Sequence, residues 1–142
     1  MTPAPWYRFL DHTGDLGILA RAPTHEALYS VATRALFDVI ADVIRIEPRD
    51  KVAVQVTGAV DREDLLVRFL SELLFLHDAR DWLFCDATVH KLTDDRVEAE
   101  ALGEPFDPDR HVIERQVKAV TYHHLLLSED RDGWSLRLVL DL

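Results

Sequence analysis

The stretch 24-THEALYSVATRALFDVIADV-43 decides the fold class, because its apolar residues recur at every third or fourth position. That period places them on one face of an amphipathic helix over residues 24–43, which Pro23 and Thr24 open. Pro48 ends any continuation of this helix. A helix with one apolar face has to bury that face against another layer of the protein, so the rest of the chain must supply a partner layer.

The rest of the chain predicts a second helix and a set of strands. Asp61 is a good N-cap for a helix that runs to about residue 77, with Glu63 and Asp64 in its first turn. Strict alternation of valines predicts a half-buried strand over residues 51–57. Further strands are predicted over residues 6–10, 16–22, 82–92, 95–103, 118–128 and 134–141, with a polar turn at 11–17 and a loop at 104–114. We therefore expect an α+β fold, a two-layer sandwich of two amphipathic helices packed on a mixed, largely antiparallel β-sheet.

The length, charge and composition of the chain limit the functions that it can have. The 142 residues fit one domain, over 1–142, and the net charge of −10 disfavours tight binding to a nucleic-acid backbone. That charge suits metal ions or a basic protein surface, although a solubilising surface explains it as well. Cys85 lies in an apolar run and is interpreted as a small buried hydrophobe rather than a nucleophile. No apolar run reaches the roughly 18 residues of a membrane span, and no signal peptide is evident, so the cytoplasm is expected.

Two acidic features suggest a metal site. The first is the segment Asp11-His12-Thr13-Gly14-Asp15, where carboxylates lie in a glycine-containing loop of the kind that hard cations use. The second is Asp141, which alternation places away from the leucine face of the last strand, close to the terminal carboxylate of Leu142. Carboxylates held this close repel each other unless a cation lies between them. The alternatives are a turn capped by its own aspartates and a frayed chain end.

Polar groups also interrupt the strand that begins near residue 118. Lys118, Tyr122 and His123 are candidate supporting residues, because such side chains are unusual in an otherwise apolar strand. His123 and His124 face opposite ways in a regular strand, so a bulge is needed before both can serve one site. The sequence contains no zinc-type spacing, no phosphate-binding glycine loop and no serine nucleophile elbow. An independent catalytic centre is therefore not indicated.

Four motifs taken together resemble the archease family over essentially the whole chain. They are Asp-His-Thr-x-Asp-x-Gly at 11–17, FLSELLFLH at 69–77, KAVTYH at 118–123 and the final Asp141-Leu142. Gly14 departs from the alanine usual in the first motif, and since both residues are small this changes little. The agreement of four motifs in one order is much more specific than any one of them.

The resemblance implies a compact α/β fold with two helices on a sheet and a role as helper protein rather than enzyme. Archeases assist the GTP-dependent RNA ligase that joins 2′,3′-cyclic phosphate or 3′-phosphate ends to a 5′-hydroxyl in tRNA splicing and RNA repair. They speed formation of the ligase–guanylate intermediate and allow multiple turnovers, so RNA is met only through the ligase and no membrane partner is expected. The family's metal ligands correspond to Asp15, Asp141 and Leu142, the last through its carboxylate or backbone oxygen. Asp11 and His12 belong to the same motif, and the cofactor is a divalent ion, either calcium, magnesium or manganese.

Two other functions stay open at this point. The chain could be a metal-dependent hydrolase or nuclease that uses the same aspartates, and activity on RNA without the ligase would favour that hypothesis. It could instead be a chaperone-like binding module with an apolar surface between helices and sheet. Suppression of aggregation that is insensitive to chelators would favour the second hypothesis.

Overall fold

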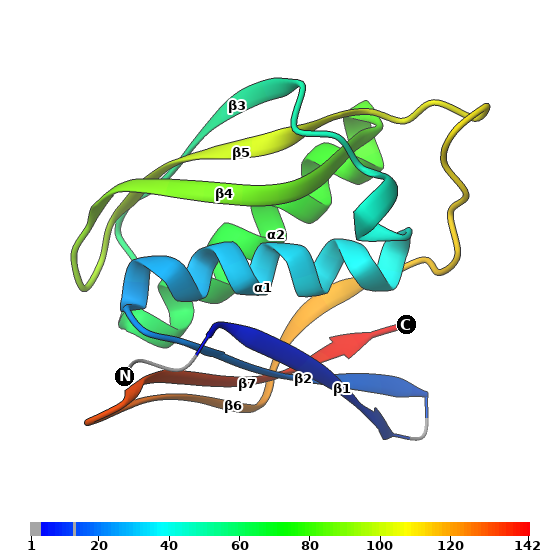
Figure 1. The fold of residues 1–142 in the computed structure, drawn as a ribbon. Helices are drawn as coiled ribbons and strands as arrows, with labels where there is room; N and C mark the ends of the chain where they lie inside the picture. Colours follow the sequence, from blue (N-terminus) through cyan, green and yellow to red (C-terminus); the bar gives the residue numbers. More distant parts are fainter. Residues whose placement is uncertain (1–3, 13) are drawn as a thin grey trace.

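Two long helices lie between two antiparallel β-sheets in the computed structural model, which describes residues 4–12 and 14–142, with residue 12 described through its main chain only (Figure 1). In chain order the elements are β1 (Trp6–His12), β2 (Asp15–Ala22), α1 (His25–Ile40), a 3₁₀ turn η1 (Val43–Arg45), β3 (Asp50–Val56), α2 (Arg62–Arg80), β4 (Trp82–Leu92), β5 (Val97–Pro105), β6 (Ala119–Asp130) and β7 (Gly133–Asp141).

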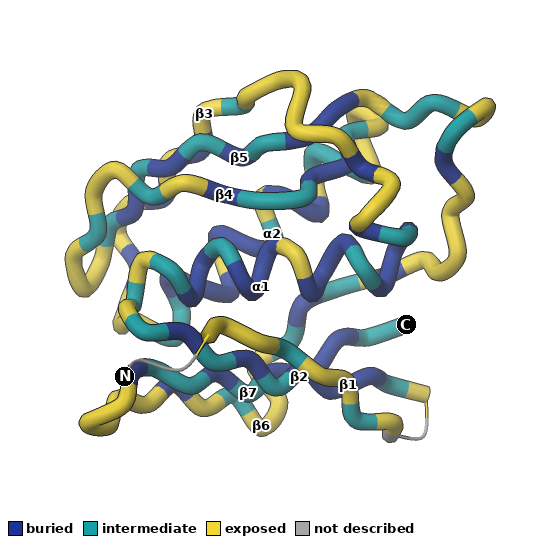
Figure 2. The backbone as a smooth tube through the Cα atoms, viewed as in Figure 1, coloured by how far each residue is buried: buried dark blue, intermediate teal, exposed yellow. Residues whose placement is uncertain are grey.

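The strands divide into a four-stranded sheet, ordered β1-β2-β7-β6, and a three-stranded sheet, ordered β3-β5-β4. Helix α1 contacts β2 of the first sheet and β4 of the second, and α2 likewise contacts β6 and β3. The predicted α+β class is confirmed, but the helices form a middle layer between two antiparallel sheets instead of covering one mixed sheet. The physical reason is visible in α1, which buries 10 of its 16 residues and so needs a partner on more than one face (Figure 2).

Helix α1 begins as the sequence predicts, since the Thr24 side chain accepts a hydrogen bond from the Ala27 N–H at 3.0 Å. It ends at Ile40, three residues before the predicted limit. Oδ1 of Asp38 accepts from the Val43 N–H, and Oδ1 of Asp42 accepts from the Ile44 N–H, each at 3.2 Å. These side chains compete with helical hydrogen bonds and turn the chain into η1.

Helix α2 is capped by Asp61, whose Oδ1 accepts from the Asp64 N–H at 2.8 Å. It continues three residues beyond the predicted end and stops at Asp81, which adopts a left-handed conformation with φ of 61°. A residue in this conformation lets its N–H satisfy the last helical carbonyls, here those of Leu76 and His77. No helix within the described residues is long and apolar enough to cross a membrane.

The predicted polar loop over residues 11–17 is wrong in its extent. Strand β1 continues to His12, and β2 already begins at Asp15. Polar residues can remain in this ladder because the sheet faces the helices on one side only, which leaves the other side open to water. The hairpin therefore carries the acidic motif on regular strands. That regularity fixes which motif residues share a face.

Candidate metal centre

The register of β2 and β7 places Asp15 directly opposite Asp141, although 126 positions separate them in the chain. Directly opposed residues of antiparallel strands have side chains on the same face, with Cβ atoms about 4.5–5.5 Å apart. Their neighbours Leu16 and Leu140, also opposite each other, are buried towards the helices. The two aspartates therefore lie together on the outer face of the four-stranded sheet, and both are half-buried.

The main chain of β6 completes this end of the sheet. Ala119 lies opposite Asp141 on the other side of β7, and the Lys118 N–H donates to the main-chain oxygen of Asp141 at 2.8 Å. Leu142 is half-buried, and its side chain packs against the hydrophobic core. Asp141 is thus held on both sides by neighbouring strands. The main-chain oxygens of Leu142, the next residue in the chain, lie close to it.

The chemistry of this group of oxygens fits a hard divalent cation. Among the side chains that the structure describes, no Lys, Arg or His forms an ion pair with Asp15 or Asp141. Two adjacent carboxylates without a counter-charge repel each other, and calcium or magnesium relieves that repulsion through oxygen ligands. The side chains that the structure describes contain no group of three or more His, Cys, Asp or Glu residues placed to bind one metal ion. The described donors would therefore leave coordination positions for water or a partner molecule.

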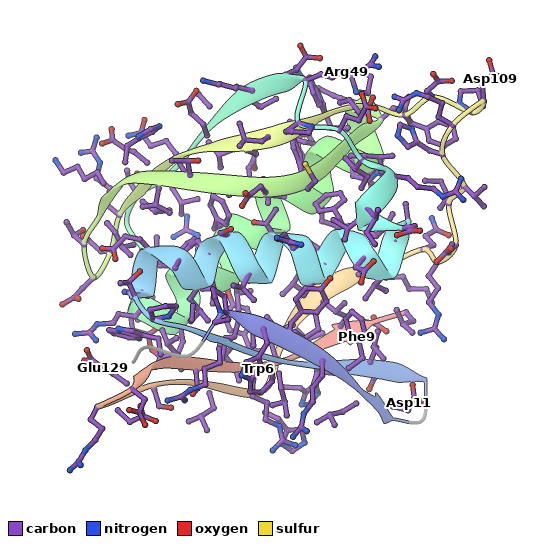
Figure 3. The ribbon with its side chains drawn as sticks, in the orientation of Figure 1. Trp6, Phe9, Asp11, Arg49, Asp109 and Glu129 are labelled. Atoms are coloured by element: carbon purple, nitrogen blue, oxygen red, sulfur yellow. The ribbon has the colours of Figure 1, made fainter. Side chains whose placement is uncertain are left out.

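Asp11 does not join this pair. It lies opposite Leu16, so its side chain belongs to the face that looks towards α1. There it lines a hollow of about 310 Å³ together with Asp38 and Glu114. Figure 3 labels Asp11 at the hairpin end of β1. The main chain of His12 lies opposite Asp15, whereas the His12 side chain and Thr13 fall outside the described residues.

Tyr122 faces the helices and not the aspartate pair, and His123 lies in an irregular segment of β6. Between Thr121 and Leu126 the register of β6 with β7 shifts, and His124 has a φ of 52°. Tyr122, two residues after the buried Val120, faces α2, and its hydroxyl donates to Oδ1 of Asp64 at 2.6 Å. That hydrogen bond lowers the pKa of Asp64 and raises the pKa of Tyr122. The bulge in β6 brings the rings of His123 and His124 to 6.2 Å of each other, which a regular strand would not allow.

A buried carboxylate that sequence reasoning missed holds the segment leading into Lys118. Glu104 accepts hydrogen bonds from Arg110, from Nε2 of the buried His111 at 3.1 Å and from the Glu47 N–H at 2.6 Å. Burial opposes its ionisation, but these hydrogen bonds outweigh burial and hold the pKa of Glu104 below its ordinary value. The only sequence signal was the polar, proline-containing stretch after β5, which also marks ordinary loops.

Comparison with known proteins decides the family. The model of the Archease protein family (MTH1598/TM1083) matches residues 7–142. This chain belongs to the archease family. It is 38% identical to the protein archease of Methanopyrus kandleri over 141 residues, which covers 97% of this chain and 99% of the relative. It is 39% identical to the protein archease of Pyrococcus furiosus over 136 residues, covering 93% and 95% respectively.

The archease fold is also shared with a solved relative. The solution structure of Methanobacterium thermoautotrophicum protein 1598 superimposes with a TM-score of 0.77 at 29% sequence identity, covering 96% of this chain and 98% of that one. The predicted family and fold class are therefore confirmed. The roles of Asp15 and Asp141 rest on the geometry of the β2–β7 end.

Proposed function

We propose that this archease is a metal-binding protein cofactor of the GTP-dependent RNA ligase that joins 3′-phosphate and 5′-hydroxyl ends in tRNA splicing and RNA repair. The observation that carries the proposal is the placement of Asp15 opposite Asp141 on an open sheet face. The proposed ligands are these two carboxylates and an oxygen of Leu142. Calcium, magnesium or manganese would fit this set of oxygen donors.

The chain's own contribution is to present this cation to the ligase. A divalent cation next to phosphate oxygens neutralises charge that develops during nucleotidyl transfer. Asp15 and Asp141 hold their positions because each lies within a paired strand, and Lys118 fixes the main chain beside them. The ligase supplies the nucleophile and contacts the RNA, so the archease acts as an activator in the cytoplasm and not as the catalyst.

The test is a guanylylation assay with the cognate ligase, GTP and each divalent ion, with and without the archease. Asp15→Asn and Asp141→Asn should each abolish the stimulation, since each removes one carboxylate ligand. Asp11→Asn should retain metal binding in calorimetry, because Asp11 lies on the opposite face of the sheet. Asp50→Asn is the matched control, since Asp50 is exposed on β3 and belongs to the other sheet.

Full stimulation by both Asp15→Asn and Asp141→Asn would contradict the proposal. Cleavage of RNA by the purified archease alone, lost in the same two variants, would instead support a metal-dependent nuclease. The assay therefore separates the two functions that rely on the same aspartates.

A further inference from the structure

The two sheets have four edge strands, and three of them carry features that hinder pairing with another strand. β6 is bulged between Thr121 and Leu126, and β4 has two register shifts. β3 opens with the charged pair Asp50 and Lys51, and its other exposed side chains are small or polar. Bulges and charges of this kind are the usual protection of exposed sheet edges.

The fourth edge, β1, carries the exposed Arg8 and Asp11 but has no bulge in its described residues. It pairs with β2 without a register shift along its whole length of seven residues. Its other side faces no strand of the described part of the chain, and it exposes two large aromatic residues, Trp6 at 42% and Phe9 at 37% (Figures 2 and 3). A regular, aromatic edge with unpaired backbone groups is a template for another strand.

We propose that β1 is a homodimer interface, where it pairs antiparallel with β1 of a second copy about a two-fold axis at Phe9. Such an axis, perpendicular to the sheet, keeps the helix-facing side chains of both copies on one face. Phe9 then lies opposite Phe9 of the second copy, and Tyr7 lies opposite Asp11. On the other face Arg8 lies opposite Leu10, so no like charges are directly opposed in this register.

The charged residues beside β1 favour a second copy of this chain as the partner that pairs with the β1 edge. A hollow of about 360 Å³ lies between the Trp6 end of β1 and α1, and Arg34 is the charged residue among its described lining. The hollow of about 310 Å³ at the other end of β1 is predominantly acidic, with Asp11, Asp38 and Glu114 against one arginine. A two-fold axis at Phe9 brings the cationic end of each copy against the acidic end of the other. The edge is thus complementary to itself in charge as well as in backbone pairing.

The aromatic residues at the axis are already ordered. The rings of Tyr7 and Phe9 are 5.7 Å apart and tilted by 58°. The Tyr7 hydroxyl donates to Oδ2 of Asp38 at 2.9 Å, which fixes the ring against α1. In the dimer two such pairs meet at the axis and form one aromatic cluster with little further ordering. Asp15 and Asp141 stay open on the opposite face, so the inference goes beyond the proposed function and does not depend on it.

Sedimentation equilibrium over micromolar to millimolar concentrations tests the proposal. The wild-type mass should rise with concentration from 16.3 kDa towards twice that value. Phe9→Lys places two like charges at the axis and should remain monomeric throughout. Phe75→Lys makes the same substitution at a 52% exposed phenylalanine of α2 and should dimerise like the wild type. A wild-type protein that stays monomeric at every concentration, or a dimer that Phe9→Lys leaves intact, overturns the proposal.

Disulfide trapping checks the register with a smaller change of side chain. In a Cys85→Ala background, Phe9→Cys should form a disulfide-linked dimer under mild oxidation, because a residue on the axis meets its own copy at a Cα separation of about 4.5–5.5 Å. Trp6→Cys is the matched control, since the two copies of residue 6 would be about 20 Å apart along the strands. Equal cross-linking at both positions, or none at residue 9, overturns this register.

Discussion

Neutralising one aspartate of the Asp15–Asp141 pair should stabilise the metal-free protein and remove its response to metal. The two side chains share one face of the sheet, with Cβ atoms about 5 Å apart, and we take the same separation for their charges. Coulomb's law then gives a repulsion of about 1 kcal/mol in water and about 3 kcal/mol at the effective dielectric of a protein surface. Because both residues are half-buried and open to solvent on one side, we expect Asp141→Asn to gain about 1 kcal/mol.

For a protein of this size, about 1 kcal/mol corresponds to a rise of roughly 3 °C in melting temperature. The wild type should respond differently when calcium is added. A ligand at 100 times its dissociation constant stabilises the folded state by about 2.7 kcal/mol, or roughly 8 °C here. The Asn variant should lose this gain. The order of the two melting temperatures should therefore reverse between chelator and metal.

Differential scanning calorimetry of wild type, Asp15→Asn and Asp141→Asn, in chelator and at several calcium concentrations, measures both effects. Asp50→Asn is the control, and neither its metal-free stability nor its calcium shift should differ from those of the wild type. If Asp141→Asn melts below the wild type in chelator, the two carboxylates do not repel each other as their register requires. If it keeps the full calcium shift, the cation is bound elsewhere.

Two further predictions concern ionisation. Glu104→Gln should destabilise the protein by about 2 kcal/mol at neutral pH, because it weakens charge-assisted hydrogen bonds to a buried carboxylate. Since folding lowers the pKa of Glu104, this difference is present above the unfolded pKa of about 4.3 and should vanish in urea melts as pH falls through the folded pKa. All three tyrosines have raised pKa values, so an absorbance titration should show no phenol ionising at the ordinary pKa of about 10, with Tyr7 at about 12 because of burial and its bond to Asp38. The stability that these neutral phenols contribute is present below about pH 10 and is lost as pH rises through their folded pKa values, and a tyrosine titrating at its ordinary pKa would contradict this.

Local patterns predicted most of the elements because each pattern reports a local cause. The apolar period located α1, and the cap at Asp61 located α2. The strand predicted over residues 82–92 has the same limits as β4. The division into two sheets could not be predicted in this way, because alternation reports which side of a strand is buried and not which strand lies beside it. The C-terminal end of α1 was also not predicted correctly, because it depends on side chains such as that of Asp42, which compete for backbone N–H groups.

The candidate site shows the same limit more sharply. Composition and alternation could mark Asp15 and Asp141 as unusual, but only the β2–β7 register shows that they face each other. The register of β1 with β2 places the Asp11 side chain on the opposite face of the sheet from Asp15. This holds although Asp11 is closer to Asp15 in sequence than any other acidic residue of the chain. In a β-sheet, an odd number of steps along a regular strand changes the face, whereas a neighbouring strand at the right register restores it. A residue 126 positions away is therefore a better candidate ligand partner for Asp15 than one within its own motif.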